Sequence, residues 1–331
     1  ALQQQGQLNE GVVHYHKALT VKPNFAQAYC NLGVALQEQG KLAEAVGSYQ
    51  KAIAIKPNYG DAQYNLGYAL QEQGKLDEAV VNYQKTITNK PNYAEVYCNL
   101  GAVLQGLGNL DEAVANYQKA LTIKPQFAGA HSNLGVALIE LGQQEEAFKS
   151  CRRAVALAPQ SDMFWSGLAT SLENLSFTSF DDNIWQILMQ LLERPMISSS
   201  ELNRPIISTL RHHPDFLSIL EATGSCNRDT EFSYADIEEL LSAIPLFLRL
   251  LELTPIFDVE VERMLTVLRR TMLREITKGE TNGKGMPFSS LVCYLLHRVA
   301  VALQSSLRVS HDVAIPSTGS QSLCNLLQGV L

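Results

Sequence analysis

The chain has 331 residues, enough for two or three domains or for one elongated repeat array joined to another domain. Nearly half of the residues are hydrophobic, but no uncharged apolar run is long enough to cross a bilayer and no secretory signal is visible, so we expect a cytoplasmic protein with no membrane partner. The net charge of −7 falls on residues 161–331, because acidic and basic residues balance before them, and the absence of a basic stripe argues against a nucleic-acid partner.

A unit of 34 residues recurs along the first half of the chain. Residues 1–25 supply the end of one copy, in which the chain begins partway through the unit. The full copies that follow occupy residues 26–59, 60–93, 94–127 and 128–161. Each full copy has Leu-Gly at positions 7 and 8, Gly at position 15, Ala at position 20 and Pro at position 32. Position 24 is Tyr49, Tyr83 and Tyr117 in the first three full copies and Cys151 in the fourth.

The spacing within each unit predicts two helices. Positions 3, 7, 10 and 11 are apolar, which places one buried stripe along the first helix (Ala28, Leu32, Ala35 and Leu36 in the first full copy). Gly at position 8 allows the two helices to approach closely, and Gly at position 15 suits a left-handed helix end. Pro at position 32 ends the second helix. One such pair cannot bury its own apolar face, so we expect the copies to stack into a solenoid.

This period and pattern resemble the tetratricopeptide repeat, a helix–turn–helix unit, over residues 1–161. The resemblance implies an all-α fold in which a right-handed superhelix is followed by a compact helical domain. Because the chain begins inside a repeat, we interpret it as a piece of a longer protein. We also expect that an exposed first repeat could stack on a second copy, which would give self-association.

An asparagine occupies position 6 of every full copy: Asn31, Asn65, Asn99 and Asn133. This position lies opposite the buried stripe, on the face that we expect to line a concave groove. A carboxamide can pair with both the N–H and the C=O of a peptide bond. First helices roughly 10 Å apart would meet an extended chain, which advances about 3.3 Å per residue, at every third residue. The alternative is structural: the asparagines cap or bridge adjacent copies.

The other groove positions are polar to acidic. The residues that we expect to contact a peptide, besides the asparagines, are Gln27, Asp61 and Glu95 at position 2, Tyr68 at position 9, and Glu38 and Glu72 at position 13. The groove has no Lys and Arg clamp for a C-terminal carboxylate. We therefore expect a protein partner that offers an extended peptide of neutral or basic character, rather than an anionic C-terminus.

The asparagine column is similar to the asparagine ladder in the repeats of O-linked N-acetylglucosamine transferases. The phrase NLGVALQEQGKLAEAVGSYQKAIAIKPN is close to the repeats of that family. The resemblance implies a grip on extended peptides. It stops at the repeats, because no glycosyltransferase catalytic domain fits in the remaining residues.

The second half of the chain reads as helical throughout. Residues 162–177 continue the pattern of a first helix and are predicted to cap the solenoid, with Gly167 where the asparagine column ends. Residues 178–331 are predicted to form an all-helical domain. Its expected helices are Asp182–Glu193, Ser200–His212, Pro214–Thr223, Tyr234–Leu253, Val259–Lys278, Pro287–Val309 and Ser320–Gln328. The segments RHHPDFLSIL, FDVEVERMLTVLRRTML and FSSLVCYLLHRVAVAL resemble the region after the repeats in cyanobacterial tetratricopeptide proteins that carry a methyltransferase-like domain.

Residues that could carry chemistry do not form a catalytic set. The His212-His213 pair lacks a third metal ligand at a suitable spacing, residues 279–285 lack the spacing of a phosphate loop, and His297 lies on an apolar helix. The six cysteines are scattered without a CxxC pair, which favours reduced thiols over disulfides or a metal site. We therefore predict a scaffold that is not an enzyme and has no cofactor. The alternative is that this chain recruits substrates for a larger methyltransferase or glycosyltransferase.

Overall fold

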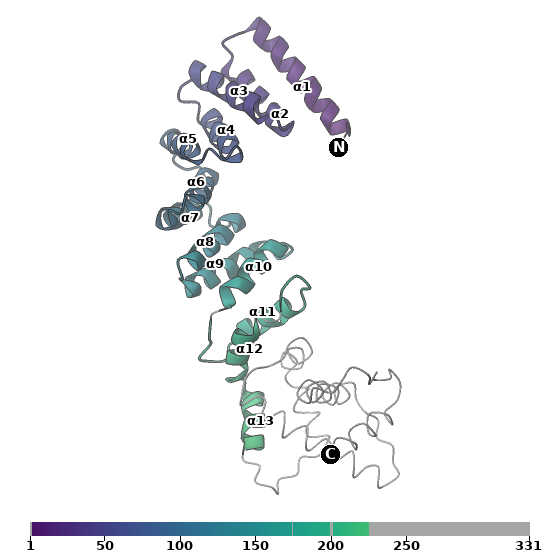
Figure 1. Cartoon of the computed structure of the whole chain (residues 1–331), viewed down its shortest axis with the longest axis vertical. Coiled ribbons are helices and arrows are strands. Elements are labelled where there is room, and N and C mark those ends of the chain that lie inside the picture. The colour runs from purple at the N-terminus through teal and green to yellow at the C-terminus, as the bar shows by residue number, and fades with distance from the viewer. Residues whose placement is uncertain (1, 174, 199–200, 225–331) are drawn as a thin grey trace, which may run out of the picture. The chain divides into compact units, whose positions relative to one another are not determined.

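A computed structural model describes residues 2–173, 175–198 and 201–224, and all of the regular structure in these residues is helical (Figure 1). The all-α class predicted from the sequence is confirmed. The chain divides into two compact units, Ala1–Leu175 and Ser176–Leu331, and each is described by itself. No helix in the described residues is long and apolar enough to cross a membrane.

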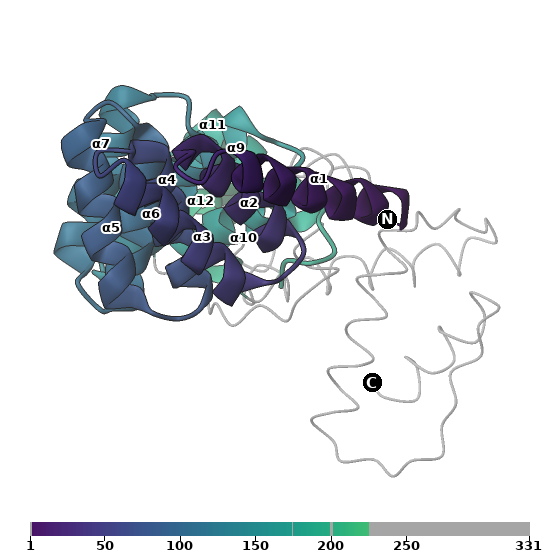
Figure 2. The same ribbon diagram turned by 90° about the horizontal axis from the view of Figure 1, so that it is seen from above.

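The first unit is a stack of antiparallel helix pairs. Its helices are α1 (Leu2–Val21), α2 (Ala26–Glu38), α3 (Leu42–Ile55), α4 (Gly60–Glu72), α5 (Leu76–Asn89), α6 (Ala94–Gly106), α7 (Leu110–Ile123), α8 (Ala128–Glu140), α9 (Gln144–Leu157) and α10 (Asp162–Leu172). Each full copy of the repeat contributes one pair. Each pair packs on the next, and neighbouring first helices also touch (Figures 1 and 2). The predicted solenoid is therefore confirmed.

Glycine at position 15 ends every first helix in the left-handed conformation. The backbone φ of Gly40 is +76°, and Gly74, Gly108 and Gly142 have φ between +74° and +82°. With this conformation the N–H of Gly40 donates to the carbonyl of Gln37 and the N–H of Lys41 donates to the carbonyl of Leu36. Left-handed φ costs an L-residue energy that glycine avoids, so the helix reverses at this position.

The helices of each pair approach closely where position 8 faces position 24. An added Cβ at Gly33 would lie 2.5 Å from a ring carbon of Tyr49, well inside van der Waals contact. Tyr49 is fully buried, and its hydroxyl donates to Oε1 of Gln37 at 2.9 Å. The same arrangement recurs at Tyr83 and Tyr117, whose hydroxyls donate to Gln71 and Gln105.

The core of this unit runs continuously through the stack. The stripe predicted for α2 (Ala28, Leu32, Ala35 and Leu36) is buried, as are its counterparts in the later first helices. Helix α10 packs on α9 and α8 and buries Phe164, Trp165 and Leu168. It therefore covers the last copy of the repeat, and it ends at Leu172, before the end of the predicted capping segment 162–177.

The described part of the second unit contains three helices: α11 (Asp182–Leu192), α12 (Asn203–Leu210) and α13 (Pro214–Gly224). Asp181 caps α11 by accepting a hydrogen bond from the backbone N–H of Asn183. These helices lie where three helices were predicted. The four further helices that the sequence predicts, between residues 234 and 328, lie outside the described residues.

Candidate functional site

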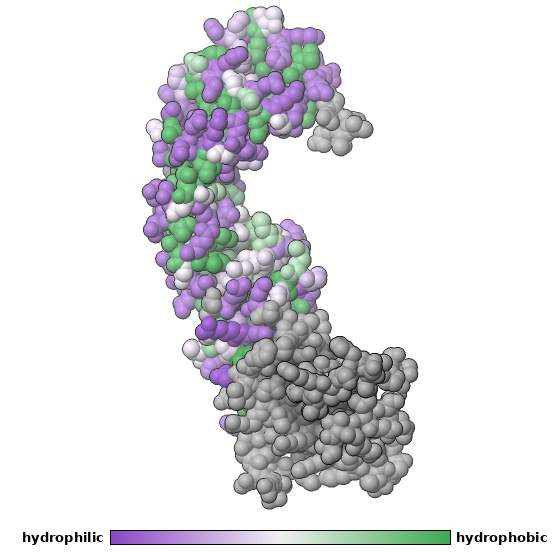
Figure 3. Space-filling model, in the orientation of Figure 1, coloured by the Kyte–Doolittle hydropathy of each residue, from purple (hydrophilic) through white to green (hydrophobic). Residues whose placement is uncertain are grey.

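The asparagines at position 6 form one column on the helices α2, α4, α6 and α8. All four side chains are half-buried, and position 9, on the next turn of each helix, exposes Val34, Tyr68 and Val136 by 37–42%. We call the surface made by positions 2, 6, 9 and 13 of these helices the first-helix face. Polar and apolar residues are interspersed over the visible side of the stack, without one broad apolar area (Figure 3).

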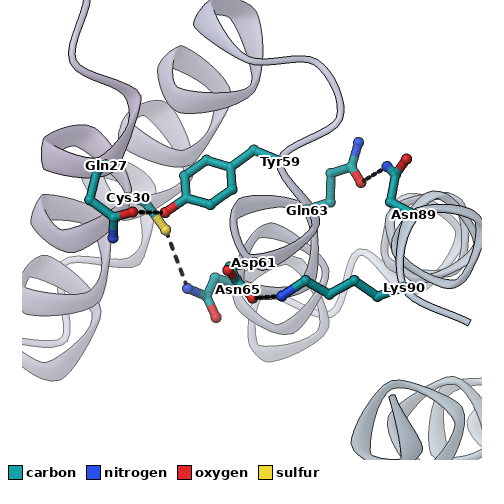
Figure 4. Close-up of polar contacts among 8 residues, drawn as sticks. All are labelled: Gln27, Cys30, Tyr59, Asp61, Gln63, Asn65, Asn89 and Lys90. Carbon is teal, nitrogen blue, oxygen red and sulfur yellow. Dashed lines mark hydrogen bonds and ion pairs between the residues drawn. The ribbon is translucent and has the colours of Figure 1, made fainter. Parts of the chain in front are cut away.

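Each asparagine after the first is tied to the preceding copy of the repeat. Nδ2 of Asn65 donates to Sγ of Cys30 at 3.7 Å (Figure 4). Nδ2 of Asn99 donates to the Tyr64 hydroxyl at 3.1 Å. Nδ2 of Asn133 donates to Sγ of Cys98 at 3.7 Å. The bridging that the sequence left as an alternative is therefore present.

This bridging leaves hydrogen-bonding capacity on the column. A carboxamide has two N–H groups and an oxygen with two lone pairs. For Asn65 and Asn133, the bond to the preceding copy uses one N–H, and the oxygen has no partner in the described part of the chain. The bond orients each amide and leaves a donor and an acceptor available. Asn31 differs, because its Oδ1 accepts a hydrogen bond from Nε2 of Gln27 at 2.9 Å.

The acidic side chains at position 2 are paired with lysines, so they add less negative charge to the first-helix face than the sequence suggested. Asp61 forms an ion pair with Lys90 (Figure 4), and Oε1 of Glu95 pairs with Nζ of Lys124 at 2.8 Å. The hydrogen bond from Lys124 lowers the pKa of the Glu95 carboxyl. Both lysines occupy position 31, directly before the proline that ends the second helix, and their pairing was not predicted from the sequence. The sequence signal for these ion pairs is that Lys-Pro recurs at positions 31 and 32 of copies whose position 2 is acidic.

In the copy 26–59, position 2 is the neutral residue Gln27. The Tyr59 hydroxyl donates a hydrogen bond to Oε1 of Gln27, and Lys56 lies 4.9 Å from the centre of the Tyr59 ring. Burial raises the pKa of Tyr59 to about 12, so its hydroxyl stays protonated and continues to donate. The position 2 residues are therefore oriented by the end of their own copy.

Position 13 is linked to the preceding copy through position 12. Nε2 of Gln37 donates to Oε2 of Glu72, while Oε1 of Gln37 accepts from the Tyr49 hydroxyl. A second chain of the same kind runs from Tyr117 through Gln105 to Glu140. These glutamines were missed in the sequence, although position 12 is glutamine in three of the full copies. Glu38 and Glu72 are both exposed, and Glu38 makes no hydrogen bond or ion pair within the described residues.

The side chains considered for chemistry are placed as follows. No group of three or more His, Cys, Asp or Glu residues that could hold a metal ion occurs in the described ranges. His213 is buried against the rings of Phe180 and Trp185, each with its centre 4.7 Å away. Burial raises the pKa of the Cys98 and Cys151 thiols to about 11, which keeps them protonated and poorly nucleophilic.

Comparison with family models finds tetratricopeptide repeats along the first half of the chain. The model described as "TPR repeat" matches residues 1–40, 35–74, 69–108 and 106–142. The model described as "Tetratricopeptide repeat" matches residues 128–161. A search of curated proteins found no match.

Three solved structures are similar to the chain. A crystal structure of MamA is 27% identical and covers 48% of this chain and 92% of its own, with a TM-score of 0.45. YrrB, described as "a TPR protein with an unusual peptide-binding site", is 19% identical and covers 54% of this chain and 91% of its own, with a TM-score of 0.46. PilF of Pseudomonas aeruginosa is 18% identical and covers 73% of this chain and 96% of its own, with a TM-score of 0.45.

Proposed function

Because residues 1–161 belong to the tetratricopeptide repeat family, whose stacked helix pairs are protein-interaction scaffolds, we propose that the first-helix face binds an extended segment of a partner protein. The observation that carries the proposal is the column of asparagines, in which the amides of Asn65, Asn99 and Asn133 are oriented by the preceding copy. Each of these amides keeps groups that can pair with a peptide main chain.

The spacing of the column suits a main-chain ligand. Packed helices lie about 8–10 Å apart, and an extended chain advances about 3.3 Å per residue. One asparagine then meets the ligand backbone at about every third residue. Contacts of this kind depend little on the ligand's side chains. The exposed Val34, Tyr68 and Val136 supply small apolar contacts between them.

The charge of this face favours a neutral or basic segment. Asp61 and Glu95 are already paired with lysines, so they repel an anionic ligand less than free carboxylates would. Glu38, however, is exposed and unpaired within the described residues, and Glu72 accepts only one hydrogen bond from a neutral amide. These carboxylates oppose a ligand that carries negative charge.

The experiment starts from a peptide selected on the full chain from a random library displayed on phage. Its affinity is measured by fluorescence anisotropy for the full chain and for Asn→Ala variants at positions 31, 65, 99 and 133. We expect each substitution to weaken binding about 2- to 10-fold, the value of one net hydrogen bond. Methylation of main-chain nitrogens at every third residue of the peptide should weaken binding in the same range.

Two control variants separate direct contact from loss of the bridges. The variant Asn116→Ala removes an amide that bonds the backbone of its own second helix. The variant Cys30→Ala with Cys98→Ala removes the acceptors of the bridges and keeps the asparagines. The first variant should bind the peptide within about 2-fold of the unmodified chain. The cysteine variant should lose less affinity than the asparagine variants, because its amides lose an orienting bond but keep their donors and acceptors. If the cysteine variant weakens binding as much as the asparagine variants do, the column acts on the fold and not on the ligand, and the proposal fails.

A further inference from the structure

One copy of the repeat departs from the others at two positions at once. Position 4 is aromatic in the neighbouring copies and in α10, and position 30 is aliphatic in the other full copies. The pairs are Tyr29 with Ile55, Tyr97 with Ile123, and His131 with Leu157. In the copy 60–93 both members are carboxamides, Gln63 and Asn89. We call these two residues the amide pair.

The amide pair is an ordered feature of the junction between two copies. Gln63 is only 4% exposed, its Nε2 donates to the carbonyl of Pro57 at 2.7 Å, and its Oε1 accepts from Nδ2 of Asn89 at 2.7 Å (Figure 4). Gln63 is buried and Asn89 is exposed. Burial of a carboxamide is costly unless it is hydrogen-bonded, and Asn89 supplies a hydrogen bond that an aliphatic residue at position 30 could not.

The same junction in other copies shows what the amide pair replaces. Nε2 of His131 lies 3.1 Å from the carbonyl of Pro125, and Nε1 of Trp165 donates to the carbonyl of Pro159 at 2.7 Å. Position 4 therefore turns toward the same proline carbonyl in each of these copies. A linear amide in place of a ring leaves space beside it.

A surface cavity of about 510 Å³, open to solvent, occupies this space, and its volume is within the usual range for ligand sites. It lies between α3 and α5 and is separate from the first-helix face. Its walls include the apolar Ile53 and Leu66, and three further carboxamides besides the amide pair: Gln50, Asn58 and Asn82. None of the described residues that line it is Asp, Glu or aromatic.

The chemistry of this lining selects the ligand. Lys85 is exposed and makes no hydrogen bond or ion pair within the described residues, so the lining carries one uncompensated positive charge. The amide pair retains free N–H groups after its own bonds are counted, and Gln50 and Asn58 add more. A metal cation would find no anionic ligand here, and a ring would find no aromatic partner. Hydrogen-bond donors around a single cation match a carboxylate.

We propose that the cavity beside the amide pair binds a carboxylate group, either the acidic side chain of a partner polypeptide or a small organic acid. Lys85 supplies the charge, and the amide N–H groups orient the carboxylate oxygens. The site is independent of the proposed peptide face, so the Asn→Ala variants of the column leave it intact.

The test uses nuclear magnetic resonance of the full chain with ¹⁵N-labelled Asn and Gln, titrated with three probes. The probes are the capped peptide Ac-Gly-Gly-Glu-Gly-Gly-NH₂, its twin with Gln in place of Glu, and glutarate. We expect saturable shifts of the Gln63 and Asn89 side-chain amides with the acidic peptide, and at least about 5-fold weaker binding of its neutral twin. Tighter binding of glutarate than of the acidic peptide would identify the source as a small acid.

Two variants test the location. Gln63→Tyr with Asn89→Ile gives this copy the side chains of its neighbour and fills the cavity, so it should abolish the saturable shifts of the remaining lining amides, Gln50 and Asn58. Lys85→Gln should weaken binding about 2- to 5-fold, while Lys119→Gln, at the same position of the next copy, should have no effect. Equal binding of the Glu and Gln peptides, no saturable shifts with any acidic probe, or equal effects of the two lysine variants would overturn the proposal.

Discussion

Substitution of Gly33 by alanine tests the packing that sets the distance between the two helices of a repeat. An alanine Cβ at this position would lie 2.5, 2.7 and 2.8 Å from three ring carbons of Tyr49. The ring cannot turn into solvent, because Tyr49 is fully buried and its hydroxyl bonds Gln37. We therefore expect Gly33→Ala to force the ring and helix α3 away from helix α2.

The expected cost follows from three contributions. Overpacking of a closely filled site costs about 1–3 kcal/mol. Displacement of the ring also weakens the 2.9 Å hydrogen bond from the Tyr49 hydroxyl to Gln37, which adds about 1 kcal/mol. The higher helix propensity of alanine offsets about 1 kcal/mol of this cost. The sum is a local destabilisation of about 1–3 kcal/mol.

Gly47, on the second helix of the same copy, provides the matched control. An added Cβ there would meet no atom within 4 Å, so only the propensity term applies. Gly47→Ala should therefore stabilise helix α3 by about 1 kcal/mol. The two variants make the same chemical change in neighbouring helices and should act in opposite directions.

The assay is amide hydrogen exchange of the full chain, read by mass spectrometry for each helix. Local opening is the appropriate quantity because repeat arrays do not always unfold as one unit. Exchange of α2 and α3 should accelerate about tenfold for each 1.4 kcal/mol lost, while α8 and α9 serve as an internal reference. If Gly33→Ala slows exchange as Gly47→Ala does, the close approach at position 8 does not limit the packing, and the reasoning is refuted.

Two further predictions concern ionisation. Lys124 lowers the pKa of Glu95 below its usual 4.5, so the ion pair stabilises the fold above that pH and the contribution is lost as the pH falls through the lowered value. Thermal unfolding followed between about pH 3 and pH 6 should therefore show a steeper loss of stability on acidification for the unmodified chain than for Glu95→Gln; equal slopes would contradict this. The thiols of Cys98 and Cys151, whose pKa burial raises to about 11, should react with iodoacetamide at about pH 8 only after unfolding. Rapid labelling in the folded chain, detected by peptide mass spectrometry, would show that these thiols are accessible thiolates.

The repeat architecture was predictable because its signals are local and repeated. The period, the apolar stripe of α2 and the left-handed glycines such as Gly40 each act within one helix or one turn. Their physical effects need no knowledge of distant residues. Five copies in register then made the stacking of the helix pairs the only way to bury the stripes.

The candidate site was only partly predictable. The sequence placed Asn65 and its counterparts on one face, since residues at the same position of identical units share an environment. It left open whether the amides bond the preceding copy, and it missed the pairing of Lys124 with Glu95. Such contacts depend on the rotation between successive copies and on side-chain rotamers. The repeat period specifies neither the rotation between copies nor the side-chain rotamers.

The sequence by itself determined the class of fold, the ends of the repeat helices and the face on which the asparagines lie. Only the tertiary structure decided which hydrogen bonds those asparagines already make, and that Gln63 and Asn89 face each other beside a cavity. The reason is physical. Helix formation and chain reversal are governed by neighbours within a few residues, whereas the partner of a side chain at a junction is chosen by how two copies pack.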